Sequence, residues 1–103
     1  VTKENEIETL KITVREITDE DINTRNLDKK TTGVVIVNIA NKSPLANLLR
    51  VNDIIIEVQK TQVKNYSDLN RIVEAIFKKG EKTLLLTVIN SNNQRRYLGV
   101  KIN

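Results

Sequence analysis

Serine and carboxylate side chains are the main candidates for chemistry in this chain, because its sequence contains no cysteine and no histidine. Without histidine there is no imidazole base to activate a serine and no imidazole metal ligand. Ser43 and Ser67 each stand before a segment expected to be helical, where a serine hydroxyl commonly caps the helix. Neither serine has the flanking glycines of a hydrolase nucleophile. We therefore predict no catalytic residue.

Carboxylates could also work in pairs as acid and base. Closely spaced carboxylates occur in two short segments: Glu4, Glu6 and Glu8 in the first, and Asp19, Glu20 and Asp21 in the second. Both segments are mainly polar, so a solvated surface is the expected setting. The second segment also lacks the glycine and the spaced oxygen ligands of a calcium-binding loop. We predict no metal site and no cofactor.

Composition indicates one domain with an aliphatic core. The 103 residues are 39% hydrophobic and 29% charged but only 3% aromatic, so isoleucine, leucine and valine must fill the interior. No stretch approaches the ~20 apolar residues that cross a bilayer, and the first residues lack the basic-then-apolar order of a signal peptide. The sequence predicts no direct membrane insertion.

The net charge of +4 is unevenly distributed. Residues 1–21 hold three basic and seven acidic side chains, a charge of −4, so residues 22–103 carry +8. A basic surface can serve only to keep the domain soluble, or it can attract acidic peptides or nucleic acid. The candidates for a nucleic-acid surface are Lys78, Lys79, Lys82, Arg95, Arg96 and Lys101. No RNA-binding or helix-turn-helix motif accompanies them, so we predict no nucleic-acid partner and keep this function as the least favoured alternative.

The first third of the chain predicts two strands and a helical turn. Residues 10–14 alternate apolar and polar side chains, which indicates a half-buried strand with odd positions facing water. A bulge or bend near Glu16-Ile17 should end it. Residues 18–28 predict a loose helical turn opened by Thr18 or Asp19. Gly33–Ile39 is a β-branched run typical of a strand buried on both faces.

The middle of the chain predicts a short helix and two further strands. Ser43 is expected to cap this helix and Pro44 to begin it. Asp53–Val58 reads as a buried strand. The chain should then turn through residues 59–62, so that Val63 pairs beside that strand.

A long helix and a hairpin complete the pattern. Ser67 can cap the helix and Gly80 can end it. Its apolar residues recur at i, i+3, i+4 and i+7 and are Leu69, Ile72, Val73 and Ile76. Residues 83–90 then predict a strand and residues 91–94 a hairpin loop. A last strand should alternate through Leu98, Val100 and Ile102.

The segment after the second strand has the motif order of a known family. In PDZ domains of the bacterial HtrA/DegP serine proteases the corresponding segment resembles GSPAA…GL..GD.I..VNG..V. This chain keeps the following positions in the same order: Ser43, Pro44, Ala46, Leu49, Asp53, Ile55, Val58 and Val63. The chain resembles this family over most of its length.

The resemblance implies an α+β, mainly β fold: a partly open PDZ-like barrel or sandwich of five to six strands with one short and one long helix, in the circularly permuted bacterial order. Residues 1–9 would be an acidic leader or interdomain linker, and residues 10–103 the PDZ domain. The domain would be the C-terminal one of a periplasmic or cell-envelope serine endoprotease and would itself be non-catalytic.

Such a domain would bind protein C-termini and unfolded segments of misfolded proteins by adding them as a strand to its sheet. An alternative with the same fold is an assembly or scaffold surface that contacts other subunits of a protease oligomer and captures no peptide.

The resemblance also places a peptide site. Leu10, Lys11 and Ile12 fall where the family's carboxylate-binding loop lies, and Ile12, Thr13 and Val14 would pair with the ligand. Lys11 departs from the family, which has glycine there. A lysine would either narrow the loop or add an ammonium partner for the carboxylate, unless it only faces solvent.

The hydrophobic groove would be lined from the long helix by Leu69, Val73, Ile76 and Phe77. Leu69 and Phe77 are the better groove candidates, whereas Ile76 is expected in the core. An apolar lining of this kind would favour an aliphatic or small aromatic ligand residue.

Other departures affect local geometry. Asn52 replaces the usual glycine before Asp53, and asparagine tolerates a left-handed backbone. Gln59-Lys60 replaces the usual Asn-Gly turn and predicts a longer or distorted connection.

Overall fold

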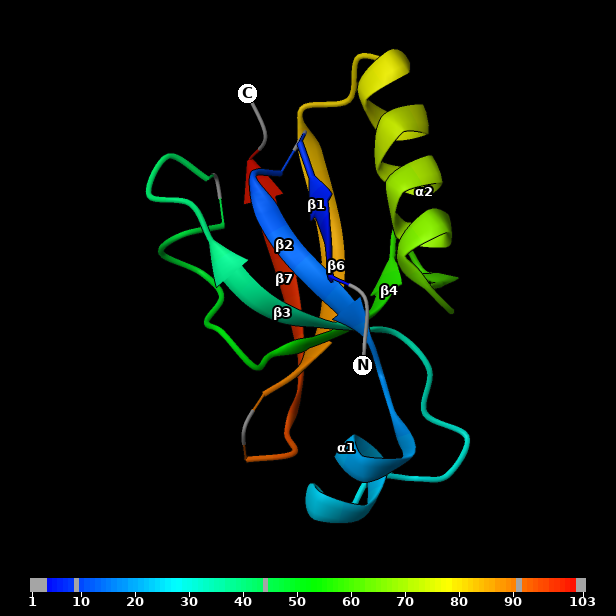
Figure 1. The fold of residues 1–103 in the computed structure, drawn as a ribbon. Coiled ribbons are helices and arrows are strands. Elements are labelled where there is room, and N and C mark those ends of the chain that lie inside the picture. The colour runs from blue at the N-terminus through cyan, green and yellow to red at the C-terminus, as the bar shows by residue number, and fades with distance from the viewer. Residues whose placement is uncertain (1–3, 9, 44, 91, 102–103) are drawn as a thin grey trace.

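One antiparallel sheet organises the chain, with the long helix packed against one face and the short helix beyond one end of the strands. The computed structural model describes residues 4–8, 10–43, 45–90 and 92–101 (Figure 1). The strands are β1 (Glu4–Ile7), β2 (Ile12–Glu16), β3 (Val34–Ile39), β4 (Ile54–Val58), β5 (Thr61–Gln62), β6 (Thr83–Ile89) and β7 (Arg95–Lys101). The helices are α1 (Asp19–Thr24) and α2 (Tyr66–Lys78). The strand order is β1-β2-β3-β4-β6-β7, and β5 pairs with β4.

The predicted mainly β architecture with one long helix is confirmed. The sheet has seven strands where five to six were expected, because residues 4–7 add β1 at its edge. The short helix is α1, at the position of the predicted helical turn. The segment expected to form a helix from Ser43 is instead a turn at residues 45–48, in which Leu45 O accepts from Leu48 N and Leu49 N. Pro44, Ser91 and Ile102 lie outside the described residues.

The two faces of the sheet are buried to different depths. The larger core lies on the α2 side and holds most of the buried side chains, among them Ile36, Leu69, Val73, Leu84 and Leu86. The smaller core lies on the opposite face and consists of Val35, Ile54, Ile56 and Ile89, with Ile17 and Leu27 packed against it. Central strands are therefore apolar on both faces, as the continuous runs in β3 and β4 predicted.

β2 ends at Glu16, as the break in alternation indicated, but the bulge in its pairing with β3 lies earlier, beside Thr13 and Val14, and is on β3. Thr13 is opposite Asn38 and Val14 is opposite Ile36, so β3 has the extra residue Val37. A bulge of this kind bends the strand and increases its twist.

α1 begins with a complete capping box. The Thr18 hydroxyl accepts from Asp21 N at 3.2 Å, and the Asp21 carboxylate accepts from Thr18 N at 2.9 Å. Arg15 of β2 donates to both Asp21 oxygens, at 2.6 and 2.9 Å. These hydrogen bonds from Arg15, together with those from Thr18, hold the pKa of Asp21 well below its usual range. The acidic segment at residues 19–21 thus helps to fasten α1 to β2.

α2 is capped by Asn65 and not by Ser67, so that prediction was wrong. The Asn65 side chain accepts from Asp68 N at 2.9 Å, which places Ser67 inside the first turn. The other end fits the prediction: Gly80 has a φ of 77°. Gly80 N donates to Phe77 O at 3.0 Å and Glu81 N to Ile76 O at 3.3 Å, the paired bonds of a Schellman motif.

The turn between β4 and β5 is tight, contrary to the expected longer or distorted connection. Val58 pairs with Thr61, which leaves only Gln59 and Lys60 in the loop, with φ values of 52° and 65°. Two positive φ values are the signature of a type I′ turn. Gln59 is also fixed from outside the hairpin: its N donates to Leu85 O at 2.7 Å and its side chain accepts from Leu85 N at 3.0 Å. Tertiary bonds therefore override the weak turn propensity.

Neither helix within the described ranges has both the length and the apolar character needed to span a membrane.

Candidate functional site

The candidate peptide site is the edge of the sheet at β2, where α2 packs over the main core. β1 occupies the outer edge of β2. It pairs antiparallel with β2 over four positions, from Glu4 opposite Arg15 to Ile7 opposite Ile12. α2 lies on the other side of β1, where the Tyr66 hydroxyl donates to Glu6 O at 3.3 Å. The strand therefore lies between β2 and α2 (Figure 1).

The predicted carboxylate loop turns sharply between β1 and β2. Leu10 is fully buried, Lys11 is exposed and Ile12 is 1% exposed. Lys11 has a φ of 54°, a left-handed conformation that glycine adopts without cost and that explains why the family uses glycine there. Its carbonyl accepts from Ala40 N at 3.0 Å, so the residue that directly follows β3 helps to hold this conformation.

Ser43 ties this loop to the turn that follows β3. Its hydroxyl donates to Leu10 O at 2.5 Å and accepts from Leu45 N at 3.1 Å. The expected capping role of Ser43 is thus seen in a turn rather than in a helix. The link to Leu10 was not predicted, although the serine of the family motif was the signal that marked the residue.

The predicted pairing strand forms, but its outer edge is covered by β1. The side chains of Ile12 and Val14 point into the core, and Thr13 is half-buried. In this arrangement a peptide cannot add to β2 unless β1 moves, because each strand edge accepts one neighbour.

The predicted groove residues belong to, or pack against, the main core cluster that also contains Ile7 of β1. Leu69 and Val73 are fully buried, Ile76 is 7% exposed and Phe77 is half-buried at the margin of the same cluster. This core placement was expected for Ile76. Leu69 was proposed as a groove residue, and its side chain is covered in this structure.

Sequence reasoning missed the helix face that flanks β1. Tyr66, Asn70 and Glu74 line a cleft of about 170 Å³ together with Glu6 and Glu8. The spacing of four residues between the helix positions puts them on one face of α2. That spacing was visible in the sequence, but polar residues at such positions are ordinary for a solvent-facing helix.

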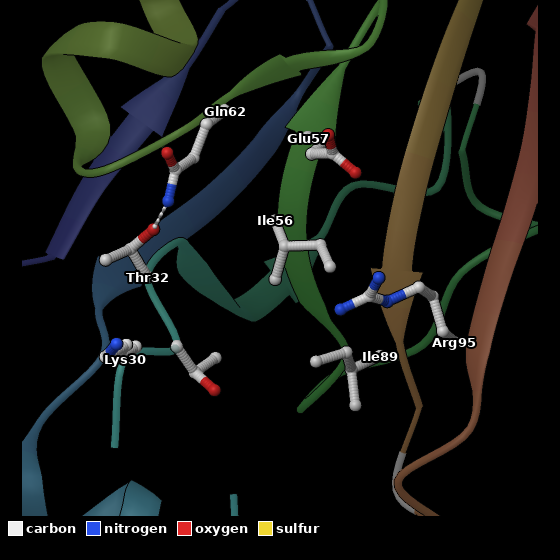
Figure 2. Close-up of a pocket in the computed structure, with 8 residues that line it drawn as sticks. Lys30, Thr32, Ile56, Glu57, Gln62, Ile89 and Arg95 are labelled. Atoms are coloured by element: carbon white, nitrogen blue, oxygen red, sulfur yellow. Dashed lines mark hydrogen bonds between the residues drawn. The ribbon is translucent and has the colours of Figure 1, made fainter. Parts of the chain in front are cut away.

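Two further cavities lie away from this edge. One of about 280 Å³ lies near the smaller core and is lined by Lys30, Thr31, Thr32, Ile56, Glu57, Gln62, Ile89 and Arg95. Figure 2 shows Arg95 extending over Ile89 toward Ile56, and Gln62 donating to Thr32 at 2.8 Å. The other, of about 400 Å³, lies beside α2 and includes Arg71, Ile72 and Lys79. No cluster of three or more potential metal ligands occurs among the residues that the structure describes.

The basic side chains weighed for nucleic-acid binding do not form one patch. Lys101 pairs with Thr83 at the start of β6, near Lys82 and the end of α2. Arg95 pairs with Ile89 at the other end of β6, about 20 Å away for a seven-residue strand. The six cations are thus divided between two ends of the sheet.

Comparison with known proteins identifies the family. The family model described as "PDZ domain" matches residues 8–102. Proteins named "Probable periplasmic serine endoprotease DegP-like" from Brucella suis and Brucella abortus are each 35% identical over 72 residues, which is 69% of this chain. The chain matches only 14% of the length of these relatives.

A solved structure supports the fold. The crystal structure of the HtrA3 PDZ domain bound to a phage-derived ligand (FGRWV) superimposes with a TM-score of 0.61. The alignment has 22% sequence identity and covers 98% of this chain and 84% of that one. The PDZ-like fold and the resemblance to the HtrA/DegP family are both confirmed. This chain belongs to the PDZ domain family and is a relative of the PDZ domains of DegP-like serine endoproteases.

Proposed function

We propose that this domain captures C-terminal or extended segments of misfolded proteins by strand addition at β2, as a non-catalytic PDZ module of a periplasmic HtrA/DegP-like serine endoprotease. The observation that carries the proposal is the space between β2 and α2, which accepts an antiparallel strand. In this structure that strand is β1. Strand addition at such an edge provides main-chain hydrogen bonds for affinity and side-chain pockets for selectivity.

The segment of residues 10–12 is the proposed carboxylate loop. Leu10, Lys11 and Ile12 would supply backbone amides and the lysine an ammonium group, which attract an anion at a sharp turn. Thr13 and Val14 would continue the pairing, and Leu69, Val73, Ile76 and Phe77 would form the floor of the pocket for the last ligand residue. The ligand of the HtrA3 domain ends in valine, an aliphatic residue that would suit such a floor.

We also propose that the domain is the C-terminal one of the parent protease and that residues 1–9 lead into it from the preceding domain, with Glu4–Ile7 of this leader paired with β2 as β1. The alternative is an assembly surface in the protease oligomer. The same β2 edge could pair with a strand of another subunit, and such pairing would not require a free carboxylate.

The test is an amide chemical-shift titration with matched peptides that end in an aliphatic residue, in free-acid and amidated forms. Peptide capture predicts shifts in residues 10–14 and along α2 near Leu69 and Val73, stronger for the free acid. Equal shifts with both forms would favour the assembly surface. Absence of shifts for every peptide, in the wild type and in the Ile7→Ala variant described below, would refute peptide capture.

A further inference from the structure

β1 lies where an added peptide strand would lie. It runs antiparallel to β2, borders α2 and ends at the candidate carboxylate loop. Strand alternation gives it the side-chain pattern of a docked peptide: Ile7 and Asn5 face inward, buried and half-buried, whereas Glu4 and Glu6 are exposed. The chain therefore presents one of its own segments to its candidate groove.

Ile7 anchors this segment. Its side chain is 0% exposed and belongs to the same cluster as Leu69 and Val73, the residues proposed as the pocket floor. The Ile7 carbonyl accepts from Leu10 N at 3.2 Å, so it engages an amide of the loop that a ligand carboxylate would use. Ile7 thus takes up both the pocket and part of the anion site.

The rest of β1 is weakly held. The strand has four residues, and Ile7 is the only one whose side chain is buried. Glu6 and Glu8 line the cleft beside α2 together with Glu74, so carboxylates of like charge face one another there. A short strand with one apolar anchor and repulsive neighbours has little to keep it in place.

We infer that β1 is a built-in occupant of the peptide groove and that a peptide must displace it to bind. This inference rests on the proposed function. The apparent affinity for peptide is then the affinity of the open groove multiplied by the fraction of molecules in which the groove is open. Capture is then restricted to ligands that compete with Glu4–Ile7: free C-termini that end in an aliphatic residue.

A disulfide across β1 and β2 tests whether β1 must leave before a peptide binds. We call this displaceable strand the gate. The Glu6→Cys/Thr13→Cys pair joins directly opposite residues whose side chains lie away from the core. Opposite residues in an antiparallel pair have Cα atoms about 4.5–5.5 Å apart, within the range of a disulfide. Since the chain has no cysteine of its own, oxidation forms only this bond. The matched control is Thr83→Cys/Lys101→Cys, an exposed opposite pair on β6 and β7.

The probe is a fluorescein-labelled Glu-Asn-Glu-Ile peptide with a free carboxylate, which repeats the sequence of β1, measured by fluorescence anisotropy. We expect the oxidised E6C/T13C protein to bind at least about tenfold more weakly than the same protein after reduction. The control pair should bind equally in both redox states. Equal binding by oxidised and reduced E6C/T13C overturns the gate and leaves peptide capture intact.

Ile7→Ala tests the same gate in the opposite direction and needs no disulfide. Removal of the anchor should open the groove more often and strengthen binding of the probe, by about tenfold if the anchor accounts for most of the closed state. Weaker binding by Ile7→Ala would show that Ile7 is a wall of the pocket, not its occupant, and would overturn the gate. If neither reduced E6C/T13C nor Ile7→Ala binds the probe or any aliphatic free-acid peptide, the proposed function fails and the gate with it.

Discussion

The two edges of the sheet are held in different ways. At one edge, β7 pairs with β6 over seven positions, from Arg95 opposite Ile89 to Lys101 opposite Thr83. At the other, β1 pairs with β2 over only four positions. Both edges carry charge on their outer side chains, which discourages association with other sheets. The β7 edge is basic and the β1 edge acidic.

This difference indicates that β7 is the firmly held edge strand and β1 the weakly held one. β7 follows β6 through a hairpin with several side-chain bonds, in which the Asn90 side chain accepts from Asn92 N and Gln94 N. β1 is attached by Ile7, the loop to β2 and one hydroxyl bond from Tyr66. Local opening free energies follow such differences in burial and bonding. We expect β1 to exchange its amide protons by local opening, and β7 only when the whole domain unfolds.

The largest expected contrast comes from truncating one core side chain near each edge. Leu84→Ala, in β6 beside β7, should lower the free energy of unfolding by about 4 kcal/mol, because the fully buried site cannot collapse around the cavity. Ile7→Ala should cost only about 2 kcal/mol, since β1 can separate from the sheet and let the site close. Urea denaturation followed by circular dichroism measures both. Equal costs would mean that the two edges are equally integral to the fold.

The ion pair between β2 and α1 gives the next effect. Asp21→Asn removes the charge that accepts two hydrogen bonds from Arg15 and should cost about 1–2 kcal/mol at neutral pH. Asp21 has a lowered pKa in the folded state, so its stabilisation is complete above its unfolded pKa of about 3.9 and is lost as the pH falls toward the folded value.

The difference in stability between the wild type and Asp21→Asn should therefore begin to shrink below about pH 4 and continue to shrink as the pH falls further, as measured by denaturation at a series of pH values. Asp19→Asn is the matched control, because Asp19 is an exposed residue of the same first turn; it should change stability by less than about 0.5 kcal/mol. A gap between wild type and Asp21→Asn that stays constant down to pH 2 would contradict the role of this carboxylate.

The permanent parts of the fold were the parts that sequence could predict. Apolar residues at helical spacing and Gly80 predicted α2. Continuous apolar runs predicted β3, β4 and β6. These signals are strong because each element buries several side chains of its own. The family motif around Ser43 and Asp53 then supplied the order of the elements.

β1 escaped prediction because its place depends on partners distant in sequence. Ile7 is its only large apolar residue, and nothing in Glu4–Ile7 shows that β2 and α2 leave room for it. The Gln59-Lys60 turn was misjudged for a similar reason: its propensity is poor, but Leu85 fixes Gln59 from another strand. The candidate site residues were assigned from the family, and their role in binding remains a prediction.

Lys60→Gly separates global from local stability. Lys60 has a φ of 65° in the type I′ turn, where glycine is free of the strain on a side chain, so the substitution should stabilise the domain by about 0.5–1 kcal/mol. Amide exchange in β7 should then slow by the factor that corresponds to this gain in stability, because the β7 amides exchange only when the whole domain unfolds. Exchange in β1 should not change, because the turn lies away from it and a local opening does not include the turn. Slowing of β1 in parallel with β7 would show that β1 opens only with the whole domain.

Tyr66→Phe has the smallest expected effect and acts on β1 directly. It removes the hydroxyl that donates to Glu6 O at the margin of α2, an exposed bond of 3.3 Å whose loss should cost about 0.5 kcal/mol. Because only the closed form of β1 has this bond, the cost falls on the local equilibrium, and β1 amides should exchange about twofold faster. Tyr97→Phe is the control, since Tyr97 lies on β7 and is 66% exposed. Faster exchange in β1 for Tyr66→Phe alone would place the weak edge at β1, whereas no change in β1 would show that Tyr66 does not hold it closed.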